Sequence, residues 1–311
     1  MYSYGFNQFG GPDVFTDLDL PEPDLKPGQM LVKVMAVGVT PYDALMREGK
    51  TQKDRPMNFP IVPGTDIVGT IVKQGSDADQ FSIGEVVIGK ANIGGYGEYV
   101  PVSQKRMVRK PEALPLAEAA ALPTPGTVAY DIFFGATELP EDQMITVMGA
   151  TGAVGSLTLQ IAKQLGHRAQ AVVSPRNTQR AQQLHADQVL TYDHALNIDE
   201  LHRTNFLVNA SRGADHLQMA LDLLKPTGIL LSLTHIPNSI RQAAPDITFI
   251  EMNDATYHQT GKALNYMVDL YGDGMLDIEV GETQPFSLAG VIEAHKDLDS
   301  GHHGKIILTN D

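Results

Sequence analysis

Two patterns of apolar residues divide the chain at about residue 122. Before this point, short apolar runs alternate with Gly and Pro, which is typical of a β-rich domain. After it, apolar strand-like runs alternate with segments of helical periodicity. Such alternation predicts an α/β region with a doubly wound parallel sheet. The runs expected as strands in the first region are 30–37, 67–73, 85–89 and 99–101.

The second region reads as repeated strand–helix units, and the tail changes character again. Strands are expected at 145–148, 169–173, 188–191, 206–209, 229–233 and 246–252. Helices are expected after the first of these strands, at 177–185 and at 214–224. The tail is expected to form a helix at 261–271, a strand at 276–280, a helix at 288–298 and a strand at 305–308.

The junction after the strand at 145–148 carries the strongest chemical signal. Glycines at 149, 152 and 155 follow the strand, and Val154, Leu157, Ile161 and Leu165 then recur at helical spacing. A strand, a tight glycine turn and a helix N-terminus together favour binding of a pyrophosphate. The alternative is a glycine-rich loop with only a packing role. The residues expected to bind the phosphates are Gly149, Ala150, Thr151, Gly152, Ala153, Val154 and Gly155.

Composition and charge narrow the class of protein. A chain of 311 residues is long enough for two domains, and its 42% hydrophobic content is ordinary for a globular protein. The net charge of −14 disfavours general binding to nucleic acid or to anionic membranes. The absence of cysteine excludes disulfides and thiol chemistry. With no signal peptide or membrane-length apolar run, we expect a cytoplasmic protein.

The spacing Gly-x-x-Gly-x-x-Gly resembles the nucleotide loop of zinc-free quinone oxidoreductases, a branch of the medium-chain dehydrogenase/reductase superfamily. Further segments match the family in order along the chain: 9–14, 32–43, 63–66, 94–99, 293–295 and 304–308. The resemblance implies a β-rich GroES-like catalytic domain at 1–121 and 259–311 and a Rossmann-type dinucleotide-binding domain at 122–258. It also implies that the active cleft lies between the two domains.

The zinc ligands of related alcohol dehydrogenases are missing. Thr40 stands where those relatives have Cys, Gly64-Thr65-Asp66 replaces their Gly-His-Glu, and the third ligand would fall near Pro125 or Gly126. Zinc needs thiolate or imidazole ligands in fixed geometry, so no metal is expected. The adjacent His302 and His303 are better explained as an exposed turn. Asp66 is expected to anchor its loop, with a direct role in the cleft as the alternative.

The residues after the second strand of the nucleotide domain favour NADP(H). An NAD site places Asp or Glu about 20 residues beyond the loop. Here Ser174, Arg176 and Arg180 follow, without an acidic residue in the nearby sequence. In the resembled family Ser174, Arg180 and Tyr192 fall on positions around the 2′-phosphate, which guanidinium groups bind strongly. The alternative is that the two arginines form a solvated helix face.

Other residues are candidates for positions near the nicotinamide end of the cofactor. By resemblance, Thr127 lies near it. Asn209 ends the fourth strand and Leu233 and Thr234 follow the fifth, where ligands gather at the carboxyl ends of parallel strands. Simple strand capping is an equal alternative for these last three.

The substrate-binding motif departs from the family. Many quinone reductases carry Asn-x-x-Asp-x-Tyr-x-Arg-x-Gly, whereas this chain has Thr40, Asp43, Leu45, Arg47 and Gly49. Hydride transfer needs a donor that polarises the acceptor oxygen. We expect Thr40 or Tyr42 to be this catalytic donor, and Asp43 and Arg47 to form a structural pair.

Together these features predict a metal-free NADPH-dependent oxidoreductase that transfers hydride to a quinone, an enone or a related conjugated carbonyl. The alternative is an NADPH-binding structural or regulatory protein with little catalysis. The residues 246–252 have strand-like content and end the nucleotide domain, so they are expected at a sheet edge. By resemblance, this edge forms a homodimer; an edge covered by the chain's own tail is the alternative.

Overall fold

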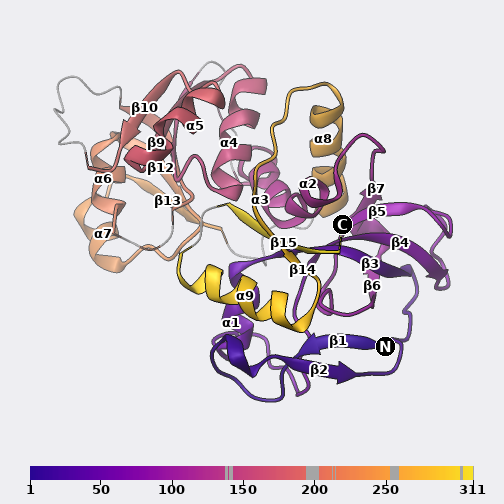
Figure 1. Cartoon of the computed structure of the whole chain (residues 1–311). Helices are drawn as coiled ribbons and strands as arrows, with labels where there is room; N and C mark the ends of the chain where they lie inside the picture. The colour runs from indigo at the N-terminus through magenta and orange to yellow at the C-terminus, as the bar shows by residue number, and fades with distance from the viewer. Residues whose placement is uncertain are drawn as a thin grey trace. The chain divides into compact units, whose positions relative to one another are not determined.

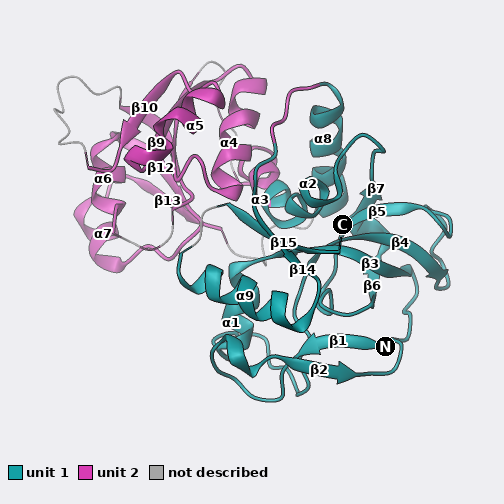
Figure 2. Cartoon of the chain, viewed as in Figure 1, with its two compact units in different colours: residues 1–127, 259–273, 278–311 teal, residues 128–258, 274–277 magenta. Residues whose placement is uncertain are grey.

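A computed structural model describes residues 1–136, 139, 143–193, 203–211, 213, 215–252, 259–301 and 304–310. The chain folds into two compact units (Figures 1 and 2). Unit 1 comprises Met1–Thr127, Gln259–Asp273 and Ile278–Asp311, and unit 2 comprises Val128–His258 and Gly274–Asp277. In the described part of the chain, no helix is long and apolar enough to cross a membrane.

Unit 1 is built on a mixed sheet with the order β14-β15-β3-β4-β5-β7, in which β6 also pairs with β3. The pairs are antiparallel, apart from the parallel pair of β14 and β15. β1 and β2 form a separate antiparallel ribbon. The predicted β-rich region is therefore confirmed. The strands are β1 (Tyr2–Gly5), β2 (Thr16–Asp19), β3 (Gln29–Val39), β4 (Asp66–Gln74), β5 (Val86–Lys90), β6 (Tyr99–Ser103), β7 (Met107–Arg109), β14 (Val280–Pro285) and β15 (Lys305–Thr309).

Helices cover parts of this sheet. α2 packs on β3, β4 and β15, and α9 packs on β14 and β15 (Figure 1). Because β15 pairs with β3, the tail returns to the first part of the chain, as the family resemblance implied. The helices are α1 (Pro41–Arg47), α2 (Leu116–Ala121), α8 (Thr260–Gly272) and α9 (Leu288–Asp299), with short 3-10 turns at η1 (Pro12–Val14) and η2 (Gln104–Arg106).

Unit 2 contains an all-parallel sheet with the order β10-β9-β8-β11-β12-β13. Numbered within the unit, this is the order 3-2-1-4-5-6 of a Rossmann fold, so the predicted doubly wound sheet is confirmed. The strands are β8 (Met144–Met148), β9 (Arg168–Val173), β10 (Gln188–Thr191), β11 (Thr204–Asn209), β12 (Leu224–Ser232) and β13 (Thr248–Glu251). The helices are α4 (Ala153–Gln164), α5 (Thr178–Gln183), α6 (Leu217–Asp222) and α7 (Asn238–Ala243), with the turn η3 (Pro175–Asn177); α3 (Pro123–Phe134) runs from unit 1 into unit 2.

The strand predicted at 276–280 is wrong, because β14 begins only at Val280. At Asp277 the side chain of Gln160 bonds both backbone groups: Asp277 N–H donates to Gln160 Oε1 at 2.7 Å, and Gln160 Nε2 donates to the Asp277 carbonyl at 3.0 Å. Because the N–H and the carbonyl of Asp277 are both bonded to a side chain, this residue does not take part in β-sheet hydrogen bonding.

Helix bounds also differ from the predictions. The helix expected at 214–224 is the shorter α6, and β12 already begins at Leu224; Ala214 lies outside the described residues. The helix expected at 177–185 is the turn η3 followed by α5. Residues 122–127 belong to unit 1, and residues 274–277 belong to unit 2. The predicted domain bounds at 121/122 and 258/259 stay a prediction.

Candidate functional site

The glycine loop of unit 2 has a backbone that only glycine allows. Gly149 has a φ of +71°, in the left-handed region, and its N–H donates to the Val172 carbonyl at 2.9 Å. A Cβ at Gly155 would lie 2.1 Å from the Gly149 carbonyl oxygen. Gly152 is the N-cap of α4 and has no side chain to bond the first N–H groups of the helix. These N–H groups are left for a ligand, as an anion site at a helix N-terminus requires.

The predicted residues after β11 and β12 form one polar network. The Asn209 amide donates to Ser232 Oγ at 3.1 Å, and the Asn209 carbonyl accepts from the Leu233 N–H at 3.0 Å. Thr234 N–H donates to Ser232 Oγ at 3.2 Å. Ser211, whose N–H and hydroxyl both donate to Asn209 Oδ1, completes it. The structure thus brings Asn209, Leu233 and Thr234 together at the carboxyl ends of neighbouring strands.

Tyr192 places a buried hydroxyl beside the glycine loop. Its oxygen is near the Gly149 backbone and the Ser211 side chain, but the geometry makes no hydrogen bond to either. Burial raises the pKa of this phenol, and its ring stacks on His216 with centroids 4.1 Å apart. A buried polar atom without a partner is costly in a protein alone, so this hydroxyl fits a site that a polar ligand fills. The loop and Tyr192 therefore fit a dinucleotide.

Besides Tyr192, the residues predicted near the 2′-phosphate follow β9 in the sequence. Ser174 precedes η3 and is half-buried, and Arg176 is exposed. Arg180 lies on α5, where its guanidinium forms a bidentate ion pair with Asp277, with both N–O distances 2.9 Å. The nearby sequence lacks an acid, but the fold supplies one from 97 residues further along the chain.

Thr127 has a local role in α3. Its hydroxyl donates to the Pro123 carbonyl at 2.6 Å, and the residue is buried in unit 1.

The two predicted donors in unit 1 differ in their surroundings. Thr40 is the N-cap of α1 in a capping box: its hydroxyl and N–H both donate to Asp43 Oδ2 at 2.8 Å, and it accepts from the Asp43 N–H at 3.3 Å. Gly64 N–H donates to the other carboxylate oxygen at 3.0 Å. Burial raises the pKa of Asp43 to about 6. Tyr42, in the first turn of the same helix, is half-buried.

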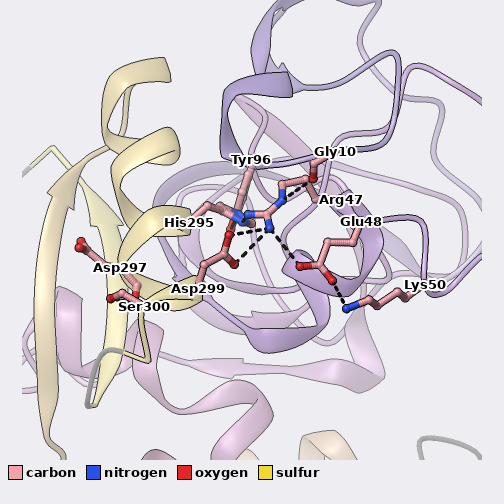
Figure 3. Close-up of polar contacts among 9 residues, drawn as sticks. All are labelled: Gly10, Arg47, Glu48, Lys50, Tyr96, His295, Asp297, Asp299 and Ser300. Atoms are coloured by element: carbon pink, nitrogen blue, oxygen red, sulfur yellow. Dashed lines mark hydrogen bonds and ion pairs between the residues drawn. The ribbon is translucent and has the colours of Figure 1, made fainter.

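The predicted Asp43–Arg47 pair is wrong, because Arg47 points toward α9 (Figure 3). The buried Arg47 guanidinium bonds both oxygens of Asp299, at 3.1 and 2.8 Å, and reaches His295 Nδ1 at 3.1 Å. Since arginine only donates, His295 Nδ1 accepts, and Nε2 carries the hydrogen that faces the Tyr96 hydroxyl at 3.1 Å. Burial, and then the charge of Arg47, lower the pKa of His295 to about 3. This network fastens α1 to α9.

Asp66 begins β4 and is fully buried in unit 1. Burial opposes its ionisation, but the Lys305 ammonium at 2.8 Å holds the pKa of Asp66 below its usual value. Its carboxylate also accepts from the Thr124 N–H at 3.1 Å and from the Thr124 hydroxyl at 2.5 Å. Asp66 thus fastens β15 and α3 to β4. Among the residues that the structure describes, no three or more His, Cys, Asp or Glu side chains lie close enough together to hold a metal ion. His302 and His303 are not among the described residues.

Comparisons with known proteins agree with this architecture. Residues 26–112 match the model of the alcohol dehydrogenase GroES-like domain, and residues 184–308 match that of zinc-binding dehydrogenase. A chloroplast envelope quinone oxidoreductase homolog of Arabidopsis thaliana is 28% identical, covering 99% of this chain and 98% of the relative. The NADPH-dependent alkenal/one oxidoreductase of the same plant is also 28% identical, covering 99% and 79%.

Solved structures give the same result. The quinone oxidoreductase of Coxiella burnetii superposes with a TM-score of 0.86 at 27% identity, covering 100% of this chain and 99% of that one. The Escherichia coli quinone oxidoreductase, solved with NADPH, shares the fold with a TM-score of 0.85 at 22% identity, covering 99% and 100%. The chain thus carries the alcohol dehydrogenase GroES-like and zinc-binding dehydrogenase domains, and over its whole length it is similar to quinone oxidoreductases of the medium-chain dehydrogenase/reductase superfamily.

Proposed function

We propose that this chain is an NADPH-dependent oxidoreductase that transfers hydride, without a metal, to a quinone, an enone or a related conjugated carbonyl. The observation that carries the proposal is the glycine loop at 149–155, which leaves no room for a Cβ at Gly155 and lies beside the unpartnered Tyr192 hydroxyl. The relatives' names support the reaction, since they include quinone, alkenal/one and 2-methylene-furan-3-one reductases.

NADP(H) is the cofactor that these residues fit. The N–H groups at the start of α4 would bind the pyrophosphate, and Ser174, Arg176 and Arg180 would surround the 2′-phosphate. The network of Asn209, Leu233 and Thr234 would border the rest of the dinucleotide, at the strand ends where ligands bind in such sheets. Bound NADPH supplies the hydride, while the protein supplies orientation and hydrogen bonds.

Tyr42 is the better candidate for the donor that polarises the substrate oxygen. The Thr40 hydroxyl is buried and already donates to Asp43, so it could serve a substrate only by giving up the helix cap. This observation also favours the second candidate, an NADPH-binding structural or regulatory protein, because one of the two expected donors is occupied.

The residues at the former zinc positions have other partners, which supports the metal-free proposal. Thr40 caps α1, and Thr65, which stands where the relatives have His, donates its hydroxyl to Asp66 Oδ1 at 3.1 Å. Asp66 is itself paired with Lys305. A carboxylate that is already paired with an ammonium has little charge to offer a metal ion.

The test is to mix the purified protein with NADPH and a panel of quinones and enones, and to follow the loss of NADPH absorbance with and without a strong chelator. We expect turnover with at least one acceptor, unchanged by the chelator. Binding of NADPH without oxidation by any acceptor would support the non-catalytic candidate. A loss of activity that is restored by added zinc would contradict the metal-free proposal.

A further inference from the structure

A carboxylate from the tail of the chain holds the arginine expected to read the 2′-phosphate. Arg180 Nη1 and Nη2 each donate to one oxygen of Asp277, at 2.9 Å. Asp277 ends the short segment Gly274–Asp277, which belongs to unit 2 although the residues on both sides of it belong to unit 1 (magenta in Figure 2). This segment therefore adds a charged side chain to the nucleotide-binding unit.

The position of Asp277 is fixed by its backbone, independently of its carboxylate. Gln160 on α4 bonds both the N–H and the carbonyl of Asp277, and the Gln160 amide also donates to the Ser156 carbonyl at 3.1 Å. Gln160 is 8% exposed, so these bonds are shielded from water. The side chain at 277 can be changed while the segment stays in place.

The ion pair persists at neutral pH. The hydrogen bonds from Arg180 hold the pKa of Asp277 below its usual value, so the carboxylate is charged. Both terminal nitrogens of Arg180 are committed to this carboxylate in a fork-to-fork arrangement, which is the geometry that a phosphate would also use. A 2′-phosphate that approaches Arg180 must share its donors and lie near a like charge.

We propose that Asp277 is a specificity-determining residue that weakens the preference for NADPH over NADH by competing with the 2′-phosphate for Arg180. NADH lacks this phosphate, and its ribose 2′-hydroxyl can donate to a carboxylate, as in NAD sites. Asp277 therefore weakens the binding of NADPH and does not weaken the binding of NADH. The inference rests on the proposed function, because it takes the loop at 149–155 as the cofactor site.

Asp277→Asn tests this proposal, because it removes the charge, keeps the size of the side chain and leaves the bonds to Gln160 intact. Calorimetric titration would use two probes that differ only in the phosphate, adenosine 2′,5′-bisphosphate and adenosine 5′-monophosphate. We expect the bisphosphate to bind roughly two- to fivefold more tightly to the variant, the factor that corresponds to releasing one exposed ion pair. The affinity for the monophosphate should stay within a factor of about two or fall.

The matched control is the same substitution in an Arg180→Ala background. If Asp277 acts through Arg180, the gain for the bisphosphate should disappear in this background. Weaker or unchanged binding of the bisphosphate to the single variant would overturn the proposal, because Asp277 would then position Arg180 or take no part. Failure of the unmodified protein to bind either probe or NADPH would instead overturn the proposed function, and the inference with it.

Discussion

The Gly149 carbonyl leaves no room for a side chain larger than hydrogen at residue 155. A methyl group at Gly155 would lie 2.1 Å from that oxygen, so the loop and the start of α4 must separate. We expect Gly155→Ala to weaken NADPH binding on the order of tenfold or more, about 1.4 kcal/mol, and to lower the unfolding free energy by about 1–3 kcal/mol. Gly272→Ala is the control, because an added Cβ there meets nothing within 4 Å. Equal effects of the two substitutions on NADPH titration would show that the loop does not approach the cofactor.

Arg180 is expected to distinguish the two cofactors. Arg180→Ala should weaken NADPH binding by about 1.5 kcal/mol, the lower end of the range for bonds to charged groups, because the guanidinium must leave Asp277 to bind a phosphate. Binding of NADH should hardly change. Parallel titrations of both cofactors measure the difference; equal losses for NADPH and NADH would show that Arg180 does not read the phosphate.

Asp43 gives the unfolding free energy a measurable pH dependence. Burial raises its pKa in the folded protein to about 6, against about 3.9 in an unfolded chain. Since the folded state binds this proton more tightly, the contribution of Asp43 to stability is largest below about pH 4 and falls as the pH rises to 6, by about 3 kcal/mol. Denaturant unfolding of the protein and of Asp43→Asn across this window should show the difference between them changing with pH. A difference that stays constant would mean that Asp43 titrates normally.

Single residues were predictable where their neighbours in sequence define their role. The glycines at 149, 152 and 155 predicted the loop, because the turn and the helix start are local. The pairing of Arg180 with Asp277 spans 97 residues, and that of Arg47 with His295 spans 248. Neither spacing nor periodicity in the sequence reveals such contacts. The pairing of Arg180 with Asp277 was therefore missed, and Arg47 was assigned the wrong partner.

At the level of elements, the capping box at the start of α1 explains Thr40 without catalysis. Thr40→Ala removes the bond to the Asp43 N–H and should lower the unfolding free energy by about 1 kcal/mol. Thr40→Ser keeps the hydroxyl and should preserve stability. Thermal or denaturant unfolding measures both variants, and kcat with NADPH separates the roles. A fall in kcat for the alanine variant without a loss of stability would make Thr40 a donor rather than a cap.

Elements were predictable where their own sequence carries the apolar signal. β8, β9 and β11 are mostly buried strands with apolar residues at their centres, and each was expected near its observed place. β14 has no fully buried residue and is fixed by pairing with β15, so its sequence gives little sign of where it starts. The short helices α1 and α7 have too few turns to show a periodicity.

At the scale of the whole molecule, the parallel sheet of unit 2 followed from the alternation of strands and helices, whereas the return of the tail followed from resemblance. Repeated strand–helix units imply a parallel sheet, and right-handed crossovers leave few orders for it. Nothing in the periodicity of residues 305–308 indicates that they pair with β3, in a part of the chain more than 250 residues earlier. Family resemblance supplied this long-range connection.

We propose that two copies of the chain pair through β13, which lies at the end of the sheet of unit 2. The Met252 N–H donates to the Ser232 carbonyl on β12, so by alternation the N–H groups of Phe249 and Glu251 face away from β12. The N–H of Thr248 faces β12, which makes Phe249 the better site for a proline.

Phe249→Pro should convert the dimer to monomers, because it removes a donor from the edge. Phe249→Ala is the matched control: it loses the same ring but keeps the N–H, and should remain dimeric. Light scattering at micromolar concentration measures both. A monomeric unmodified protein, or a proline variant that stays dimeric, would show that this edge is not the interface.

Hydride transfer from NADPH to carbon, on which the proposed function rests, can be followed by isotope transfer. The protein is mixed with an enone and NADPH that carries deuterium in both positions at C4, and the product is analysed by mass spectrometry and NMR. We expect one deuterium on the former alkene carbon β to the carbonyl, with the second hydrogen, on the α carbon, taken from solvent. A product without deuterium at that carbon, or no product from any quinone or enone while NADPH is bound, would contradict it.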